Sequence, residues 1–390
     1  MKICFYADTI FSYGGVQRVL SNIAIALSKK YDITILTLED IKAKDLSMYG
    51  LKNSSLRFYF LKYKGLKIWE WFPCKTYGFL YKKILPKNAL TSKLYGYSSF
   101  PLSRRKKLIK FINEENFDVV IGVHAFLSLH LASIRNQIKS KTIGWMHTSY
   151  DAFFNTPNFY LWGQKERFSY EMKRLDKIVV LTKNDKDLLD ENLGIKSEVI
   201  YNPLTLIPIG KGSPENKKFL AVGRLIYLTK GFDILIKAFN VFSKQNKEWT
   251  LDIVGEGPDE TFLKQLIKDY NLGKRIIIHP FSNNVQKYYA SASIYILSSR
   301  WEGFGLVLLE AMAHNLPIIA SKIPVTCEIL NKSGANVFFE SENFNDLAKK
   351  MIKMVNSDNL KEMGEKAYSY SQKFDISYII KKWEKLLSNL

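Results

Sequence analysis

Two glutamates stand eight positions apart in the segment RWEGFGLVLLEAMAHNLPIIAS, which covers residues 300–321. Glu302 precedes a Gly-Phe-Gly turn, whereas Glu310 lies inside an apolar run. One carboxylate accepts hydrogen bonds from two neighbouring hydroxyl groups, an arrangement that suits a ribose diol. Because the neighbours of Glu310 leave little polar surface, the pattern indicates a carboxylate that binds a ligand. An exposed position on an amphipathic helix is the alternative interpretation.

The Gly-Phe-Gly turn predicts that a helix starts near Gly305. Backbone amides in the first turn of a helix lack intrahelical acceptors and lie at the positive end of the helix dipole, so they form an anion site. The two glycines of the turn allow a close approach to the backbone. We therefore expect a phosphate group at the amides of Phe304, Gly305 and Leu306. Both glutamates would border the same bound molecule.

A second group of candidate residues lies in AVGRLIYLTKGFD, residues 221–233. Arg224 is predicted to end a strand, and Lys230 is predicted to open a helix. Two fixed cations beside a helix N-terminus can hold a diphosphate, the guanidinium through its planar fork and the ammonium as a point charge. The same charges stabilise a leaving phosphate. Ordinary surface charge in a loop is the alternative interpretation.

Glycine turns and histidines supply further candidates. Gly14 and Gly15 lie between the first predicted strand and helix, where folds of this kind bind phosphate, and Gly255 forms another turn at a strand end. His147 follows a predicted strand and is the candidate catalytic histidine, while His124 has a similar position. The sequence contains no HExxH, CxxC, P-loop lysine or nucleophile elbow, so we expect no metal site.

The elements that must position these residues alternate between strands and helices. Runs rich in β-branched residues and leucine indicate strands buried on both faces, and apolar residues with a period of 3.6 indicate helices. The first half has predicted strands at 1–8, 32–38, 117–123, 141–147 and 177–182, with a helix at 14–30. The second half has predicted strands at 218–225, 249–255, 275–280, 293–299 and 316–321, with helices at 231–245, 259–272 and 284–292.

This alternation is typical of α/β domains with a doubly wound parallel sheet. The segment 201–218 is rich in proline and glycine and is predicted to be a linker. We therefore predict two Rossmann-like domains, 1–205 and 206–370, that face a cleft where ligands bind. The C-terminal segment 371–390 is predicted to contain a helix that can pack back on the first domain.

The formal net charge of +20 is concentrated between residues 51 and 110, where fifteen lysines and arginines accompany one acid, Glu70. Ten aromatic residues between 58 and 81 are interleaved with these cations. Cations mixed with aromatic rings suit an anionic membrane surface or a lipid-linked partner. Nucleic acid binding and a merely solvated lysine-rich surface are the alternatives. The sequence favours the membrane surface, and we expect no nucleic acid partner.

Other features limit the class of protein. No apolar run approaches the roughly 18 residues that span a bilayer. The N-terminal segment is expected to be a strand entering a loop rather than a signal peptide. The three cysteines are scattered and form no disulfide framework, which fits a reducing cytosol.

The quoted segments, together with GGVQRVL at 14–20 and VGEGPD at 254–259, resemble a retaining glycosyltransferase of the GT4 type with the GT-B fold. The resemblance covers most of the chain and is strongest from Phe219 to Ser321. Glu302 and Glu310 match the E-x7-E signature of that family. Five residues separate Arg224 from Lys230, where the family pattern has four.

The resemblance implies a nucleotide-sugar donor, with a UDP-sugar favoured, held by the second domain, while the first domain takes the acceptor. Arg224 and Lys230 would contact the diphosphate, Glu310 the ribose, and Glu302 the sugar. The backbone of 304–306 would contact sugar and phosphates. No metal ion and no other cofactor would be required, because cations and helix termini replace the metal.

The first domain would also contact the donor in the resembling family. Gly15 would approach the diphosphate, and His147 would lie beside the transferred sugar. In the second domain the resemblance implies base recognition near Phe281, although the segment HPFSNN departs from the family's usual glycine turn there.

The implied role is sugar transfer to a glycan or polyprenyl-linked acceptor in the assembly of bacterial capsule, O-antigen or lipopolysaccharide. The expected location is the cytoplasm, peripheral at the inner face of the plasma membrane. Two alternatives remain open: a nucleotide-sugar epimerase of the same fold, and a non-catalytic basic protein that binds membranes.

Overall fold

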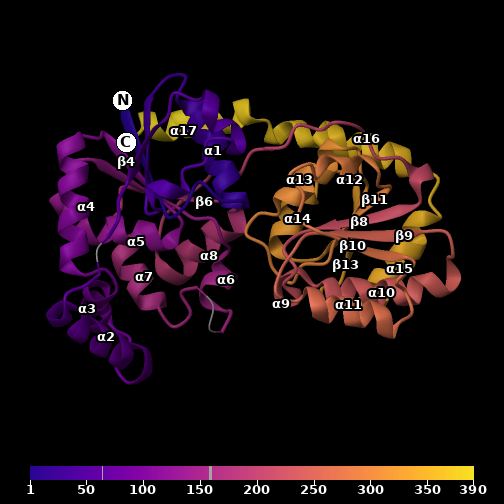
Figure 1. Cartoon of the computed structure of the whole chain (residues 1–390), viewed down its shortest axis with the longest axis horizontal. Helices are drawn as coiled ribbons and strands as arrows, with labels where there is room; N and C mark the ends of the chain where they lie inside the picture. Colours follow the sequence, from indigo (N-terminus) through magenta and orange to yellow (C-terminus); the bar gives the residue numbers. More distant parts are fainter. Residues whose placement is uncertain (64, 158–159) are drawn as a thin grey trace. The chain divides into compact units, whose positions relative to one another are not determined.

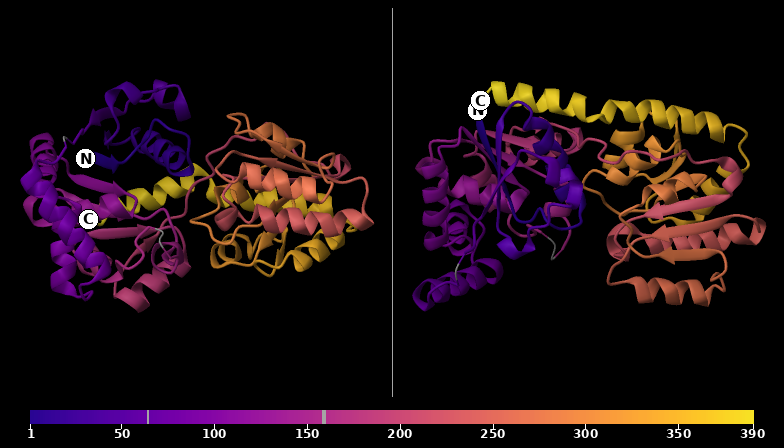
Figure 2. Two further views of the ribbon diagram at one scale, coloured as in Figure 1. Left: turned by 60° about the horizontal axis from the view of Figure 1, so that its bottom comes forward. Right: turned by 45° about the horizontal axis from the view of Figure 1, so that its top comes forward.

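The computed structural model describes residues 1–63, 65–157 and 160–390 (Figure 1). The chain forms two compact units. Residues 1–202 and 376–390 make up the first unit, and residues 203–375 make up the second. Each unit contains a parallel sheet with helices packed on it (Figure 2), so the predicted α/β architecture of two doubly wound domains is confirmed.

In the described part of the first unit, seven parallel strands form one sheet in the order β3-β2-β1-β4-β5-β6-β7. The strands are β1 (Lys2–Ala7), β2 (Asp32–Thr37), β3 (Arg57–Phe60), β4 (Val119–Val123), β5 (Lys141–Trp145), β6 (Lys177–Val180) and β7 (Glu198–Val199). The helices are α1 (Gly15–Leu27), α2 (Ile68–Lys83), α3 (Ala89–Ser99), α4 (Leu102–Glu115), α5 (Ala125–Ile134), α6 (Tyr150–Phe154), α7 (Lys165–Met172), α8 (Lys183–Leu193) and α17 (Ile376–Ser388).

In residues 203–375, all of which the structure describes, six parallel strands have the order β10-β9-β8-β11-β12-β13. The strands are β8 (Lys218–Val222), β9 (Thr250–Val254), β10 (Ile276–His279), β11 (Ile294–Leu297), β12 (Ile318–Ser321) and β13 (Asn336–Phe339). The helices are α9 (Tyr227–Lys230), α10 (Phe232–Gln245), α11 (Glu260–Asp269), α12 (Gln286–Ala290), α13 (Leu306–Ala313), α14 (Pro324–Leu330), α15 (Phe344–Val355) and α16 (Leu360–Ser371).

Both sheets reverse their strand order beside the first strand of the unit. In the first unit this switch lies between β1 and β4, and in the second it lies between β8 and β11. Ligands of doubly wound sheets bind outside the carboxyl ends of the strands at such a switch point. The loops that follow these strands are therefore the places to look for a site within each unit.

The central strands are nearly continuous apolar runs because helices cover both faces of each sheet. In β4 every residue is buried, and in β1 every residue after Lys2 is buried. Helix α10 buries nine residues of its inward side, which accounts for the periodic pattern in its sequence. No helix in the described ranges is both long and apolar enough to cross a membrane.

Helix α17 belongs to the first unit and packs against α1 (Figures 1 and 2). It starts at Ile376, whereas residues up to Ser371 belong to α16. The indole of Trp383 is fully buried, and its ring centroid lies 4.9 Å from that of Trp145 at the end of β5 in an edge-on arrangement. This contact ties the end of the chain to the first sheet.

Replacing Trp383 by alanine should therefore destabilise the first unit. Removing a large buried aromatic side chain costs about 3–5 kcal/mol of unfolding free energy. Chemical denaturation followed by circular dichroism would measure the shift of the midpoint. The matched control is Tyr378→Ala on the same helix, where the side chain is 58% exposed and the expected change is within about 0.5 kcal/mol. Equal shifts for the two variants would contradict this packing.

Candidate active site

The loops that follow β8 and β11 bring together two residues that the sequence predicted for one site. The ammonium of Lys230 donates to Oε1 of Glu302 at 2.6 Å, and both side chains are largely buried. The hydroxyl of Ser299 donates to the same oxygen at 2.6 Å. The Glu302 carboxylate is therefore held by a cation from one loop and a hydroxyl from its own loop.

A close backbone contact fixes these two loops. Gly231 has a φ of 63°, and a Cβ at this position would lie 2.1 Å from the carbonyl oxygen of Ser298. The hydroxyl of Ser298 in turn donates to the carbonyl of Lys230 at 2.9 Å. Only glycine combines this backbone conformation with this approach. The position of Lys230 beside Glu302 thus depends on the glycine that follows it.

Arg300 adds a second link between the same loops. Its guanidinium lies 2.9 Å from Oδ1 of Asp233 in α10 and also donates to the carbonyl of Tyr227. Paired donation from a guanidinium fork to one carboxylate fixes orientation as well as charge. This arginine restrains the segment that carries Lys230, and the sequence analysis did not identify it.

Glu310 lies in the middle of α13 and is 2% exposed. Its Oε2 accepts a hydrogen bond of 2.8 Å from the hydroxyl of Tyr289 in α12. The ring of His314 stacks on Tyr289, and Nδ1 of that histidine lies 2.7 Å from the carbonyl oxygen of Glu310. Burying a carboxylate is costly unless donors reach it, so Tyr289 supports this position.

The expected helix start is close to the observed one. Helix α13 begins at Leu306, and Gly305 precedes it with a φ of 78° in the left-handed region. The side chain of Phe304 is buried, and its ring centroid lies 6.2 Å from that of Phe374. A ligand at this turn would therefore meet the backbone of Phe304 rather than its ring.

The predicted positions of Arg224 at the end of a strand and of Lys230 at the start of a helix were wrong in detail. Strand β8 ends at Val222, so the exposed Arg224 lies in the following loop, and Lys230 closes the short helix α9 instead of opening α10. The reason is the hydrogen bonding of the loop: the amide of Ile226 donates to the carbonyl of Arg224, and the amide of Tyr227 donates to Oδ2 of Asp259 at 2.9 Å. These bonds turn the chain before it can continue the strand.

The two other donor-binding candidates of the second unit lie at separate strand ends. Gly255 follows β9, and a Cβ there would lie 1.9 Å from the carbonyl oxygen of Gly223. This glycine therefore permits close packing against the segment that carries Arg224. Phe281 follows β10 and is 43% exposed. Contact of either residue with a donor stays a prediction.

In the first unit, the loop after β1 is organised by a carboxylate that the sequence analysis missed. Glu39 accepts hydrogen bonds from the amides of Ile10 and Phe11 at 2.8 and 3.2 Å and from the hydroxyl of Thr9. The chain then reaches Gly14, the N-cap of α1. This carboxylate shapes the approach to the predicted phosphate loop.

A tyrosine holds the glycine pair itself. The amide of Gly14 donates to the hydroxyl of Tyr49 at 2.9 Å, and helix α1 begins at Gly15. Tyr49 adopts a left-handed conformation with a φ of 49°. Its ring packs edge-on against that of Tyr13. The first turn of α1 therefore stands beside two tyrosines at the carboxyl end of β1.

His124 and His147 follow the neighbouring strands β4 and β5. The His147 ring packs on Trp145 with centroids 4.2 Å apart, and its buried Nε2 has no hydrogen-bond partner among the described residues. Burial, with a smaller effect of nearby His124, sets the pKa of His147 well below its usual value. Burial also lowers the pKa of His124 to about 4. Both imidazoles are therefore neutral at pH 7.

The residues that sequence analysis missed had weak local signals. Ser299 could have been inferred from its place three residues before Glu302 at a strand end. Tyr289 lies in the run YYASA, and Glu39 lies just after β2. Neither segment has a sequence pattern that predicts which residues these side chains contact. In the described residues, no group of three or more metal-ligating side chains has a geometry that could hold a metal ion.

Two family models match the chain in succession. The model described as Glycosyltransferase Family 4 matches residues 13–206, and the model described as Glycosyl transferases group 1 matches residues 207–373. An uncharacterised glycosyltransferase of Haemophilus influenzae is 31% identical to this chain over 395 residues, with 99% of each chain covered.

Other relatives carry more specific names. The amylovoran biosynthesis glycosyltransferase AmsD of Erwinia amylovora is 26% identical, again with 99% of each chain covered. The N-acetylgalactosamine-N,N'-diacetylbacillosaminyl-diphospho-undecaprenol 4-alpha-N-acetylgalactosaminyltransferase of Campylobacter jejuni is 23% identical, with 93% of each chain covered.

Solved structures resemble the whole chain. Anabaena Alr3699/HepE in complex with UDP superposes with a TM-score of 0.76 at 17% identity, with 100% of each chain covered. The apo form of the lipopolysaccharide outer core galactosyltransferase WaaB gives a TM-score of 0.70 at 18% identity, also with 100% of each chain covered. At these identities the likeness concerns the fold.

The low pKa of His124 predicts a change in acid sensitivity. Because this folded-state pKa of about 4 lies below the unfolded value of about 6.5, protonation favours unfolding. Its contribution to stability is complete above pH 6.5 and is lost as the pH falls through 4. The His124→Asn variant, which tolerates the φ of 79°, should lose less stability in this window, by up to about 1.4 kcal/mol per pH unit.

Urea unfolding at several pH values between 7 and 4 would measure the slope. His147 is unchanged in the variant, so part of the wild-type acid sensitivity should remain. If wild type and variant lose stability in parallel over the whole range, the His124 imidazole is not held neutral by the fold.

Proposed function

The chain belongs to glycosyltransferase family 4 and has the GT-B fold, and from this premise we propose that it transfers a sugar from a UDP-sugar to a lipid-linked glycan acceptor. Transfer would retain the configuration at the anomeric carbon and would serve assembly of a bacterial surface polysaccharide. The names of AmsD, WaaB and the undecaprenol-dependent Campylobacter enzyme support this role, and the UDP complex of HepE supports the donor.

The proposal rests chiefly on the contact between Lys230 and Glu302 at the ends of β8 and β11. A diphosphate oxygen would compete with the carboxylate for the Lys230 ammonium. Glu302 would then become available to accept hydrogen bonds from hydroxyl groups of the sugar. The ion pair between Lys230 and Glu302 could in this way be replaced by one contact of Lys230 with the diphosphate and one contact of Glu302 with the sugar.

The leaving group would be a nucleoside diphosphate that gains negative charge as the glycosidic bond breaks. Arg224 is exposed in the loop after β8 and could reach an anion together with Lys230. Fixed cations that act mainly on developing charge typically contribute about 10²–10³ in kcat each. Since these cations supply the charge that a metal ion would otherwise provide, we propose that no metal is required.

Glu310 is proposed to bind the nucleotide ribose. Its carboxylate accepts a hydrogen bond from the hydroxyl of Tyr289, and a carboxylate is the acceptor type that suits two neighbouring hydroxyl groups. The amides of 304–306 are proposed to contact the sugar and the phosphates. Phe281 and Gly255 complete the proposed donor contacts of the second unit.

The first unit is proposed to hold the acceptor and to contribute Gly14, Gly15 and His147 to donor binding. Because burial keeps the His147 imidazole neutral, it can donate or accept a hydrogen bond but supplies no positive charge. The proton of the acceptor hydroxyl would pass to an oxygen of the departing diphosphate. The acceptor hydroxyl would form its bond to the anomeric carbon on the same face of the sugar from which the diphosphate departs.

Loss of the ribose or diphosphate contact should abolish transfer without unfolding the protein. We expect Glu310→Ala and Arg224→Ala each to lower kcat/KM at least about 10²-fold, because charge-assisted hydrogen bonds to the donor are lost. Nucleotide release would be measured with and without acceptor, using UDP-, GDP- and ADP-sugars. Lys237→Ala on α10 is a control for general loss of surface charge.

Thermal shifts with the same nucleotide sugars separate binding from chemistry. The wild type should be stabilised by the UDP-sugar more than by the other two, and Glu310→Ala should lose this stabilisation. Wild-type turnover in either purified variant would contradict the assignment of the donor site. Nucleotide release that does not depend on acceptor would favour an epimerase or a hydrolase.

Helix α2 supports a membrane-facing role for the first unit. Of the residues of α2, all of which the structure describes, Tyr81 alone is buried. Trp69, Trp71 and Phe72 are 73%, 47% and 63% exposed, and Lys67 and Lys75 flank them along the chain. Exposed aromatic rings with cations suit the headgroup region of an anionic bilayer. We propose a peripheral position at the cytoplasmic face of the plasma membrane.

Co-sedimentation with vesicles would check this proposal. The protein should pellet with phosphatidylglycerol-containing vesicles at low salt and should dissociate as salt screens the cations. The double variant Trp71→Ser with Phe72→Ser should bind at least about tenfold more weakly, because two rings no longer enter the interface. Equal binding to neutral vesicles, or none to anionic ones, would argue against a membrane-bound enzyme.

A further inference from the structure

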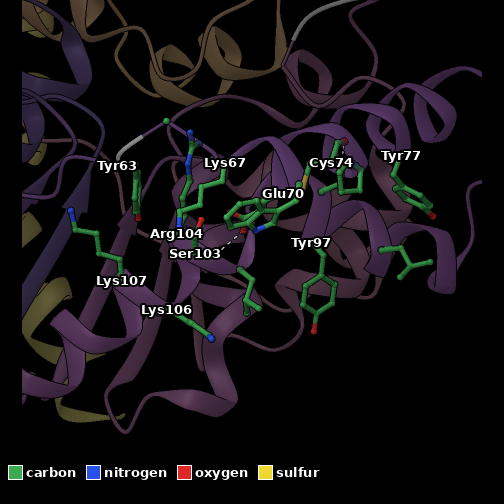
Figure 3. A pocket seen from close by; sticks show the side chains of 16 residues that line it. Tyr63, Lys67, Glu70, Cys74, Tyr77, Tyr97, Ser103, Arg104, Lys106 and Lys107 are labelled. Carbon is green, nitrogen blue, oxygen red and sulfur yellow. Dashed lines mark hydrogen bonds between the residues drawn. The ribbon is translucent and has the colours of Figure 1, made fainter.

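A cavity of about 930 Å³ lies within the first unit, between α2, α3, α4 and the segment that precedes α2 (Figure 3). Its size falls within the range of roughly 300–1,000 Å³ that is usual for small-ligand sites. None of the residues assigned above to sugar transfer lines it. The cavity is therefore a separate feature that the donor site does not explain.

Apolar and aromatic side chains form the walls of this cavity. Trp69 and Tyr77 come from α2, whereas Leu94 and Tyr97 come from α3. Leu94 and Tyr97 are 45% and 47% exposed, so the walls leave apolar surface open to solvent. Covering such surface is favourable in proportion to its area. This lining suits a hydrocarbon chain.

The α2–α3 pair that forms these walls is held together by specific contacts. The rings of Tyr81 and Tyr95 stack with centroids 4.3 Å apart. The hydroxyl of Ser98 donates to the carbonyl of Cys74 at 2.8 Å, and that of Tyr77 donates to the carbonyl of Thr91 at 3.1 Å. These contacts fix the spacing of the two helices and so keep the walls of the cavity in place.

The other side of the cavity is cationic. Lys67, Arg104, Lys106 and Lys107 line it, as Figure 3 shows. Glu70 is the one acidic group among the described lining residues, and its Oε1 accepts a hydrogen bond of 2.9 Å from the amide of Ser103. The first turn of α4 thus engages that carboxylate, Lys107 also donates to the carbonyl of Lys62, and the four cations outnumber the single acid on this side of the cavity.

Arg104 has a fixed position in this cationic group. Its guanidinium lies over the ring of Tyr63, 5.4 Å from the centroid. The hydroxyl of Tyr63 lies 3.2 Å from that of Tyr6, which lies 3.2 Å from Nδ1 of His130. Among the described residues, the buried Nε of Arg104 has no hydrogen-bond partner. A buried donor without an acceptor is uncommon in folded proteins, and an anion beside the guanidinium would supply one.

We propose that this cavity binds the isoprenoid diphosphate portion of a lipid-linked acceptor. The diphosphate lies against Arg104, Lys106 and Lys107, and the first isoprene units lie against Trp69, Leu94 and Tyr97. This assignment rests on the proposed function, in which the acceptor is lipid-linked. The combination of an apolar wall with several cations distinguishes it from a site for a free phosphate.

Calorimetry with the full-length protein and farnesyl diphosphate tests the cavity directly. Arg104→Gln removes the charge, and Leu94→Trp fills the apolar part. Each should weaken binding at least about tenfold, while the exposed α3 controls Lys93→Gln and Leu90→Trp, which do not line the cavity, should change it less than about twofold. Unchanged affinity in both cavity variants, with circular dichroism showing that they are folded, would overturn the proposal.

Farnesol and inorganic diphosphate separate the two parts of the ligand. Each should bind at least about tenfold more weakly than farnesyl diphosphate, because each makes half of the contacts. If inorganic diphosphate binds as tightly as farnesyl diphosphate, the cavity is only a charged surface. If Arg104→Gln weakens vesicle binding but not farnesyl diphosphate binding, the cations serve membrane headgroups. Either result would overturn the assignment.

Donor binding distinguishes failure of this inference from failure of the proposed function. If no nucleotide sugar stabilises the protein but the variants affect farnesyl diphosphate as expected, the cavity assignment stands and the proposed reaction fails. If transfer to a lipid-linked acceptor proceeds with wild-type KM in Arg104→Gln and Leu94→Trp, the reaction stands and the cavity assignment is overturned.

Discussion

Parallel pairing between β8 and β11 is the constraint on which the candidate donor site depends. Because both strands run in the same direction, their following loops leave the sheet at one edge, and Lys230 reaches Glu302 across 72 residues of sequence. Gly231 then lets the first loop approach the carbonyl of Ser298. A shift in the pairing of these strands would separate the loops and leave a buried carboxylate without its cation, at a cost of about 3–5 kcal/mol.

The buried glutamates show how the fold holds charge where a ligand could use it. Glu302 is held by Lys230 and Ser299, and Glu310 accepts from Tyr289. These partners offset the cost of burial, and they also fix the carboxylates before any ligand arrives. Groups of this kind add little net stability compared with apolar residues of similar size. Their burial, one at the end of β11 and the other within α13, therefore points to function rather than to folding.

Much of this arrangement could be predicted from the sequence, because strands buried on both faces are continuous apolar runs. The start of α13 at Leu306 follows from the Gly-Phe-Gly turn. The end of β8 was misplaced, since one of the bonds that turn the chain joins the amide of Tyr227 to Asp259, a residue 32 positions away. Tyr289 and Glu39 could not be found at all, because their contacts join different crossovers of the chain and leave no local pattern.

The α2–α3 pair is a second case in which the composition of a segment could be interpreted but its three-dimensional arrangement could not be predicted. Charge and aromatic content between residues 51 and 110 predicted an exposed surface, but the cavity depends on how α2 packs on α3, where Tyr81 stacks on Tyr95. Helix α2 buries one side chain and contains Pro73, so neither core packing nor helix propensity explains it. A protein that keeps such a helix beside a well-packed sheet gains little stability from it. Its exposed rings and cations therefore point to a ligand, and α3 and α4 complete the surface that would receive it.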